Sequence, residues 1–309
     1  MGYLVTGARG FIGGHLLDRL RADGHQAHGI SRGYGDDGRN QASHELTGDV
    51  RDQKQMQAIL RQTRPDIIFH CAAQSYPGIA WKAPLDTFEA NAVGTLSLLQ
   101  SMIDVDLSPR VVICSSSAVY GSGNGRDPIN ESHALAPADP YGLSKVTQEE
   151  IGRYFVRNHS TDVVFARPFF VMGPRKEGDV CSDFAREIVT IESGAKDTIS
   201  VGNLEVYRDF LDINDAVEAM LLLADRGKGG EAYNICSGDG QSIQSILDIL
   251  MRHCKRPEIS VSVAADKLRK NDLKYRVGDC EKLQALGWTA NVSLETSLPN
   301  ILQYWRKRS

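Results

Sequence analysis

The strongest constraint on the fold is an alternation of short apolar segments with longer stretches of helical periodicity. The apolar segments read YLVT, HQAHGI, HELTG, DIIFH, RVVICS and DVVFAR, and helical spacing is found between them at 10–22, 52–62, 84–103 and 139–158. Strands that alternate with helices in this way form a parallel sheet with helices on both faces. We therefore expect an α/β protein in which residues 1–167 form a Rossmann-like, doubly wound parallel sheet.

The second half of the chain has a different pattern. Beyond Pro168 the alternation weakens, and residues 213–225 and 242–252 read as isolated amphipathic helices. A chain of 309 residues is long enough for a large core with a smaller lobe attached. We expect residues 168–309 to form a smaller C-terminal α/β substrate lobe, with segments such as EAYNI returning a strand to the main sheet.

Composition excludes several classes of protein. The net charge of -4, from 35 basic and 39 acidic residues, lacks the basic excess of nucleic-acid binders. No stretch approaches the roughly 20 apolar residues of a membrane span. The six cysteines form no C-x-x-C pair, and the eight histidines form no H-x-H or H-E-x-x-H motif. We expect a cytoplasmic protein with reduced cysteines and no metal, which binds neither nucleic acid nor membrane.

A glycine-rich segment, TGARGFIG, follows the first strand and opens the first helix. Gly7, Gly10 and Gly13 permit a tight turn, close approach of the backbone to a pyrophosphate, and close packing of the helix on the strand. An ordinary strand-to-helix turn is the alternative. The position of the motif at the head of a repeated strand-helix pattern favours a dinucleotide site.

The end of the second strand indicates which dinucleotide is bound. It reads GISR, without the acid that usually bonds the ribose 2'-hydroxyl. Arg32, together with Arg9 of the glycine segment, suits a 2'-phosphate and predicts NADP, with NAD still possible. The alternative is that both are ordinary solvated arginines. Asp49 and Val50, after the third strand, would flank the adenine.

Tyr141 and Lys145 lie four positions apart in a helical stretch and so share a face of the helix. A nearby ammonium can lower the pKa of a tyrosine by ~1 to 3 units from about 10, into a useful range for proton transfer. A Tyr/Lys pair with this spacing, taken alone, is usually solvent-exposed and has no catalytic role. Its combination with the glycine segment and with SSSAVYG after the fifth strand favours a catalytic pair.

TGARGFIG, HCAAQS, SSSAVYG and YGLSK together resemble the extended short-chain dehydrogenase/reductase family, whose members act on nucleotide-sugars. The four motifs occur in the family's order and spacing over essentially the whole chain. The resemblance implies a catalytic set of Ser116, Tyr141 and Lys145. It implies cofactor contacts from Gly7, Arg9, Gly10, Phe11, Ile12, Gly13, Arg32, Asp49, Val50, Ala72, Ala73, Asn91, Tyr141, Lys145 and Pro168.

The second lobe resembles the subgroup that handles GDP-mannose derivatives, the 4,6-dehydratases and the GDP-6-deoxy-4-ketohexose reductases. The matching segments are VGNLEVYRDF, INDAVEA, YNICSG and VGDCEKLQALGW. One departure is Phe170, where many members have Asn. Trp81 either lines the sugar pocket or covers the core. The resemblance implies a GDP-sugar substrate contacted by Gln74, Ser75, Ser117, Arg186, Arg208 and Arg269.

The residue two positions after Ser116 separates the reactions of the family. The dehydratases carry Glu there and the fucose-synthase type carries Cys, and both side chains transfer protons. This chain has Ala118, whose methyl group cannot transfer a proton in either reaction. The resemblance therefore implies NADPH-dependent reduction of the C4 ketone of a GDP-4-keto-6-deoxyhexose. A nucleotide-sugar 4-epimerase is the alternative, and a catalytically dead NADP-sensing or scaffold protein is a third possibility that the intact catalytic set opposes.

The family resemblance also implies a homodimer built through a four-helix bundle. The stretches 84–103 and 139–158 carry more apolar residues than one core-facing stripe needs. These residues are Val93, Leu96, Leu99, Ile151, Tyr154 and Phe155.

Overall fold

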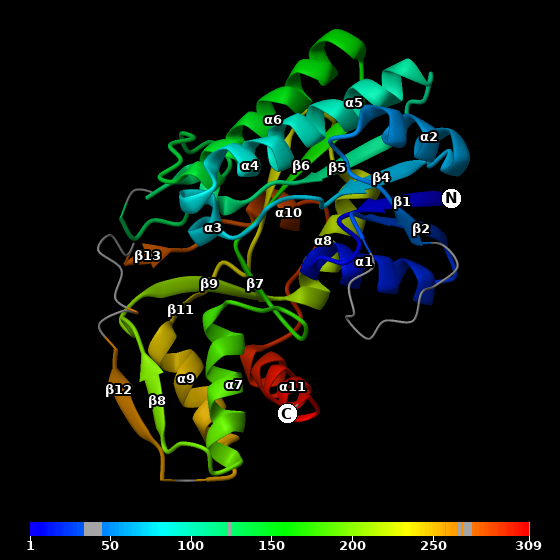
Figure 1. Ribbon diagram of the computed structural model, residues 1–309. Coiled ribbons are helices and arrows are strands. Elements are labelled where there is room, and N and C mark those ends of the chain that lie inside the picture. The colour runs from blue at the N-terminus through cyan, green and yellow to red at the C-terminus, as the bar shows by residue number, and fades with distance from the viewer. Residues whose placement is uncertain (34–44, 123–124, 257, 265–266, 268–273, 309) are drawn as a thin grey trace.

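A seven-stranded parallel sheet forms the larger part of the molecule (Figure 1). The computed structural model describes residues 1–308 except 34–44, 123–124, 257, 265–266 and 268–273. Within these residues the strand order is β10-β6-β5-β4-β1-β2-β3, and each neighbouring pair is parallel. The predicted doubly wound α/β fold is confirmed. The strands are β1 (Gly2–Thr6), β2 (Gln26–Ser31), β3 (Glu45–Thr47), β4 (Ile67–His70), β5 (Arg110–Cys114), β6 (Val163–Pro168) and β10 (Ala232–Ile235).

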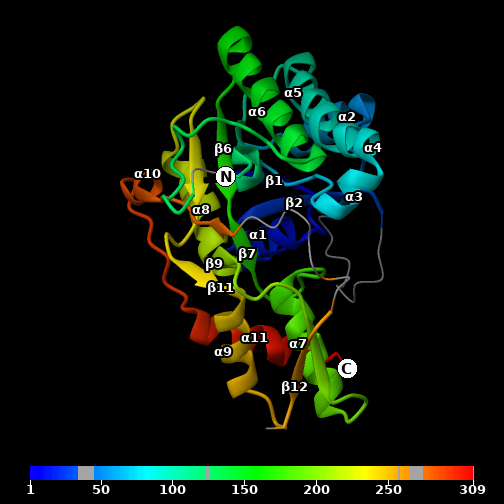
Figure 2. The same cartoon turned by 90° about the vertical axis from the view of Figure 1, so that its left-hand side faces the viewer.

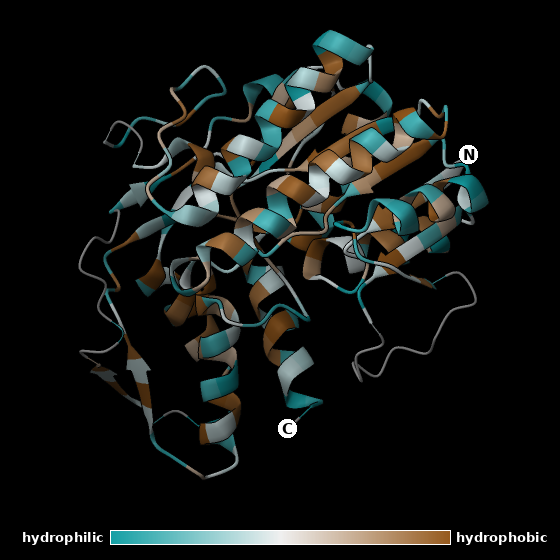
Figure 3. Ribbon diagram, turned by 45° about the horizontal axis from the view of Figure 1, so that its top comes forward, coloured by the Kyte–Doolittle hydropathy of each residue, from teal (hydrophilic) through white to brown (hydrophobic). Residues whose placement is uncertain are grey.

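Helices cover both faces of this sheet (Figures 1 and 2). On one face α1 (Phe11–Ala22) packs against α8 (Ile213–Arg226), and on the other α2 (Gln53–Thr63), α5 (Gly94–Asp104) and α6 (Pro140–His159) lie side by side. Strands covered on both faces are predominantly apolar, and every residue of β4, including His70, is buried. The same strands are largely brown in Figure 3. None of the described helices combines the length and apolar character needed to span a bilayer.

The helix expected over 84–103 is interrupted. It divides into α4 (Pro84–Phe88), a π-helical turn η1 (Glu89–Val93) and α5. Asn91, inside the turn, is fully buried, and its carboxamide accepts from the Gln74 N–H at 2.7 Å and donates to Ser144 Oγ at 2.8 Å. Single π-turns often accompany functional sites, because they rotate a side chain off the regular helical face. Here the turn fixes the loop after β4 to helix α6.

The second lobe is built on smaller sheets beside the carboxyl ends of the main strands (Figure 1). Strand β10 comes from the second half of the sequence but pairs with β6 in the main sheet. Helix α8, from the same half, also packs on the main sheet. The division at residues 167 and 168 stays a prediction. The lobe contains β7 (Phe170–Met172), β8 (Thr198–Val201), β9 (Tyr207–Asp212), β11 (Gly240–Ser242), β12 (Ser260–Val263), β13 (Tyr275–Arg276), α7 (Val180–Glu192), α9 (Ile243–Arg252) and α11 (Leu294–Arg306). The short helix α10 (Glu281–Gln284) instead packs against β10 of the main sheet.

Candidate active site

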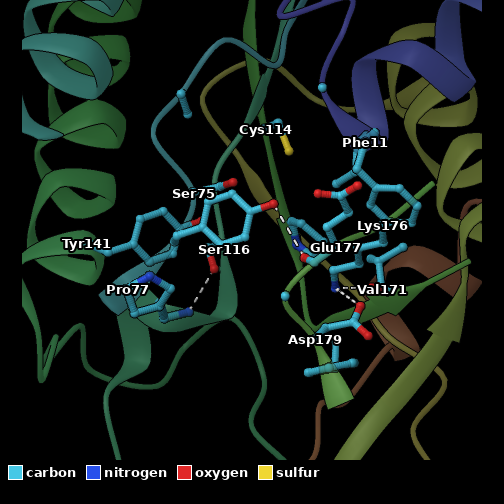
Figure 4. Close-up of a pocket in the computed structure, with 18 of the residues that line it drawn as sticks. Phe11, Ser75, Pro77, Cys114, Ser116, Tyr141, Val171, Lys176, Glu177 and Asp179 are labelled. Atoms are coloured by element: carbon cyan, nitrogen blue, oxygen red, sulfur yellow. Dashed lines mark hydrogen bonds and ion pairs between the residues drawn. The ribbon is translucent and has the colours of Figure 1, made fainter. Parts of the chain in front are cut away.

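A cavity of about 1160 Å³ lies between the carboxyl edge of the main sheet and the second lobe. Ligands of doubly wound proteins bind at this edge, where the loops after parallel strands meet. In Figure 4, Tyr141 and Ser116 face the cavity from the main domain, and Lys176, Glu177 and Asp179 face it from the opposite side. The cavity is therefore bounded by both halves of the chain.

The glycine segment forms one end of the cavity, and its geometry explains the glycines. Gly7 has a φ of +68°, and a Cβ there would lie 2.7 Å from the Ala72 nitrogen. A Cβ on Gly13 would lie 2.4 Å from the Gly7 oxygen. Gly10 caps α1 without a side-chain hydrogen bond, so the first amides of the helix stay open toward the cavity. This arrangement fits the pyrophosphate of a dinucleotide.

The adenosine end of the cavity carries the two predicted arginines and an acid that sequence reasoning missed. Arg9, Arg32, Asp49 and Val50, for which the sequence predicts cofactor contacts, all line the cavity. However, the Arg9 guanidinium already pairs with Glu45 of β3 at 3.1 Å. A 2'-phosphate would therefore share Arg9 with this carboxylate. Glu45 gave no signal in the sequence, because the pair joins residues 36 positions apart.

Ser116, Tyr141 and Lys145 come together in the middle of the cavity. Ser116 caps the short helix η2 (Ser117–Tyr120), and its hydroxyl accepts from the Ala118 N–H at 3.1 Å. Tyr141 and Lys145 project from the first turns of α6, where Asp139 caps the helix. The Lys145 ammonium donates to the Cys114 carbonyl at 2.7 Å and to Gln148 Oε1 at 2.9 Å. Two elements, the end of β5 and α6, thus position all three groups.

The pKa of Tyr141 shifts in the direction opposite to the one expected. Burial raises the pKa of this phenol above its ordinary value of 10.0, and a hydrogen bond with Ser116 offsets only part of the rise. Lys145 does not reverse the shift, because its ammonium bonds elsewhere and lies 5.9 Å from the centre of the tyrosine ring. Tyr141 is therefore a neutral phenol at neutral pH, which is the state of a proton donor.

The remaining predicted cofactor residues divide into two groups. Phe11, Ile12, Ala72, Ala73 and Pro168 line the cavity, together with Gly7, Gly10 and Gly13. Asn91 is not among the lining residues and acts on the loop after β4 instead.

The predicted substrate residues divide in the same way. Ser75, Ser117 and Arg208 line the cavity. The Gln74 amide folds back onto its own loop and donates to the Tyr76 carbonyl at 3.0 Å. Arg186 is exposed, and its guanidinium lies 5.0 Å from the centre of the Trp305 ring, away from the lining. Arg269 falls outside the described residues.

Side chains that the sequence did not single out also reach the cavity. Lys176 lies with its ammonium 4.4 Å from the centre of the Phe170 ring and 3.2 Å from Asp179 Oδ2. The departure at position 170 therefore places a lysine over an aromatic ring, where many family members have an amide. Arg276 lines the cavity as well. Trp81, by contrast, is 65% exposed and does not line it.

The residue that separates the family's reactions lies beside the catalytic tyrosine. Ala118 lines the cavity and packs with Ala80 and Tyr141 in a small apolar cluster. Its methyl group therefore occupies the place from which a longer side chain would reach a bound sugar. No cluster of metal-ligating side chains is found in the described part of the chain.

Comparison with known proteins identifies the family and related structures. The model of the GDP-mannose 4,6 dehydratase family matches residues 4–301. GDP-6-deoxy-D-mannose reductase of Pseudomonas aeruginosa is 32% identical over 79% of this chain and 81% of its own length. Two solved structures are each 28% identical. RMD from Pseudomonas aeruginosa in complex with NADPH superposes with a TM-score of 0.88 over 100% of both chains. UDP-glucose 4-epimerase of Thermotoga maritima superposes with a TM-score of 0.89 over 100% of this chain and 99% of the epimerase.

These matches confirm the resemblance to the extended short-chain dehydrogenase/reductases and the expectation of an oxidoreductase-type enzyme. The NADPH in the first of these structures agrees with the cofactor expected from the sequence. The chain belongs to the GDP-mannose 4,6 dehydratase family.

Proposed function

We propose that the protein reduces the C4 ketone of a GDP-4-keto-6-deoxyhexose to the GDP-6-deoxyhexose with NADPH. The observation that carries the proposal is the assembled set of Ser116, Tyr141 and Lys145, with the methyl group of Ala118 packed against Tyr141 at the position two residues after Ser116. This arrangement provides for proton transfer to one oxygen, and position 118 offers no group for proton transfer at a neighbouring carbon. The reductase relative supports the same reaction.

The roles of the three residues follow from their geometry. NADPH supplies the hydride, and the protein must protonate the oxygen on which negative charge develops. Tyr141 donates this proton, since burial keeps its phenol neutral. Ser116 hydrogen-bonds the same oxygen. Lys145, held by Cys114 and Gln148, places a positive charge near both groups and toward the ribose of the cofactor.

The preference for NADPH depends on Arg9 and Arg32, which line the adenosine end of the cavity. Charge-assisted bonds from guanidinium groups suit a 2'-phosphate, whereas NADH offers only a hydroxyl there. Glu45 weakens this preference by pairing with Arg9, but Arg32 also lines the cavity and still favours a 2'-phosphate. NAD is therefore a possible second cofactor.

The substrate-binding assignments are also proposals. Ser75, Ser117 and Arg208 would contact the GDP-sugar from the cavity wall, and Gln74 would act by shaping the loop that carries Ser75. Arg186 and Arg269 are retained from the sequence alone.

A 4-epimerase is the second candidate, favoured by the close superposition on a UDP-glucose 4-epimerase. Such an enzyme uses the same tyrosine in both directions and retains its cofactor between turnovers.

One experiment separates the reductase from the epimerase. The protein is incubated with NADPH and a GDP-4-keto-6-deoxyhexose, the 340 nm absorbance is followed, and the product is identified. Reductase activity consumes NADPH with one-to-one formation of GDP-6-deoxyhexose, whereas conversion of a GDP- or UDP-hexose to its C4 epimer without net cofactor consumption would overturn the proposal.

We further infer a homodimer formed through α5 and α6. Leu96 of α5, Tyr154 of α6 and Val93 at the end of η1 are each 44–48% exposed, which costs free energy in a monomer. Leu99 and Phe155, grouped with them at the sequence level, are instead buried in the core. A cytoplasmic location is consistent with the six free cysteines.

A further inference from the structure

Arg276, at the end of β13, is a half-buried cation without a carboxylate partner among the described residues. Its guanidinium lines the cavity, and Nη2 donates to the Gly121 carbonyl at 2.6 Å. The Nε–H is buried and has no hydrogen-bond partner in the described structure. Burial lowers the pKa of Arg276, and Asp139 of the same cavity wall opposes this through its charge without forming an ion pair. A buried N–H donor of a charged group costs free energy when it has no acceptor, and a bound ligand could supply that acceptor.

Arg276 also stands directly beside a second arginine. Strands β13 and β9 are parallel and pair in register, with Arg276 opposite Arg208. In-register positions of neighbouring strands project to the same side of a sheet, and both side chains line the cavity. Like charges in such positions repel each other. Asp209 does not neutralise them, because its carboxylate accepts from Ser237, Gly238 and Gly278.

The contact with Gly121 locates this pair of arginines in the site. Gly121 directly follows η2, the short helix that Ser116 caps and that contains Ala118. The guanidinium of Arg276 therefore borders the catalytic loop, where the sugar and its nearest phosphate would lie. A planar fork of N–H groups at this place matches two oxygens of one anionic group.

We propose that Arg276 is a substrate-binding residue whose guanidinium, beside that of Arg208, binds an anionic group of the nucleotide-sugar. The inference rests on the proposed function only in taking a nucleotide-sugar as the ligand. The anionic group can come from two sources, the diphosphate or a carboxylate at C6 of the sugar. Sequence reasoning assigned no role to Arg276.

Calorimetric titration of the full-length protein separates these sources. The ligands are GDP, GDP-mannose and GDP-mannuronate, of which the last two differ only in the group at C6. The variants are Arg276→Leu, which removes every donor, and Arg276→Lys, which keeps the charge but loses the planar fork. Arg252→Leu, on an exposed arginine of α9, is the matched control. Thermal unfolding of each variant without ligand provides a second readout, and Arg276→Leu should not lower the midpoint, because it removes a half-buried charge that has no carboxylate partner.

If Arg276 binds the diphosphate, Arg276→Leu weakens all three ligands by about 10- to 150-fold, and Arg276→Lys recovers part of the loss. If it binds a sugar carboxylate, only GDP-mannuronate is weakened. Affinities within twofold of wild type for all three ligands would overturn the proposal. Should the wild type bind no GDP compound, the proposed GDP-sugar substrate fails on its own, and the same comparison is made with UDP, UDP-glucose and UDP-glucuronate. A wild type that binds neither series overturns both proposals.

Discussion

Arg167 and Glu149 form an ion pair that is almost completely removed from solvent, with Nη2 and Oε2 2.6 Å apart and side chains 3% and 0% exposed. Glu149 projects from the catalytic helix α6, and Arg167 lies near the end of β6. Glu149 also accepts from the Ser115 hydroxyl at 2.5 Å, and Arg167 donates to the Tyr120 hydroxyl at 2.7 Å. The pair therefore fastens α6 to both ends of the loop that carries Ser116.

The first prediction concerns this pair. Glu149→Gln leaves Arg167 buried without its counter-charge, and we expect the free energy of unfolding to fall by about 3–5 kcal/mol. Urea denaturation monitored by circular dichroism measures the change. Glu295→Gln, in the exposed pair with Arg252, is the control and should cost less than about 1 kcal/mol. Equal losses in the two variants would show that the buried pair has no special role.

The pH dependence of stability provides a second test of the same pair. Burial alone would raise the pKa of Glu149, but its hydrogen bonds and the charge of Arg167 bring it below the ordinary value of about 4.5. A carboxyl group with a lowered folded pKa stabilises the protein above its unfolded pKa, and this contribution is lost as the pH falls through the folded value. The difference between wild type and Glu149→Gln should therefore be constant from pH 7 to about pH 5 and narrow at lower pH.

The next prediction concerns the proton donor. Tyr141→Phe keeps the ring and removes only the hydroxyl, so turnover should fall by a factor on the order of 10² to 10⁴ while NADPH binding survives. Because burial raises the pKa of Tyr141, the wild-type reduction rate should show no loss from its ionisation up to pH 10.0. Stopped-flow measurement of NADPH oxidation against pH checks both points. Near-normal turnover in Tyr141→Phe would exclude this residue as the acid.

The structure predicts that some substitutions weaken NADPH binding and that one strengthens it. Arg9→Ala and Arg32→Ala should each weaken NADPH binding by about 10- to 150-fold and leave NADH unchanged, because only the 2'-phosphate loses partners. Glu45→Gln should instead tighten NADPH binding, by up to about fivefold, since Arg9 is released from its 3.1 Å ion pair. Fluorescence titration measures the affinities, with Arg19→Ala of α1 as the control. A wild type that already prefers NADH would favour the epimerase instead.

Assembly is tested by charging the apolar outer face. Leu96, on α5, is 44% exposed, and Leu96→Glu should convert the proposed dimer to a monomer of 33.9 kDa in sedimentation velocity at micromolar concentration. Val261→Glu, at a similarly exposed position on β12 of the second lobe, should leave the dimer intact. A wild type that sediments as a monomer would contradict the proposal.

The sequence predicts the parts of the site that depend on local pattern. The glycine segment, the tyrosine-lysine pair and the serine segment each occupy a short stretch, and the order of strands and helices brings their strand ends together. Local sequence patterns do not predict contacts between segments that are far apart in the chain. The Arg9–Glu45 pair and the bond from Arg276 to Gly121, which spans 155 positions, depend on tertiary packing. The pKa of Tyr141 was expected in the wrong direction for the same reason, because its burial is a property of the folded cavity.

The last prediction concerns Ala118. Removing water across C5 and C6 of a hexose requires a base at C5 and an acid at the C6 hydroxyl, and a methyl group supplies neither. Given GDP-mannose and NADP⁺, the protein should therefore release no 4-keto-6-deoxy sugar, even where hydride removal at C4 occurs slowly. Mass spectrometry of the products, with boiled protein as the blank, checks this.

Restoring the missing group sharpens the test. Ala118→Glu would place a carboxylate beside Tyr141, where Ala118 now packs against Ala80, and should lower the rate of reduction through crowding. Ser117, the buried neighbouring hydroxyl, has no carboxylate or histidine as a hydrogen-bond partner in the described structure and should not substitute for the missing group. Release of the keto sugar by the wild type at a rate comparable to reduction would mean that another residue supplies the proton transfer, and the assignment as a reductase would have to be withdrawn.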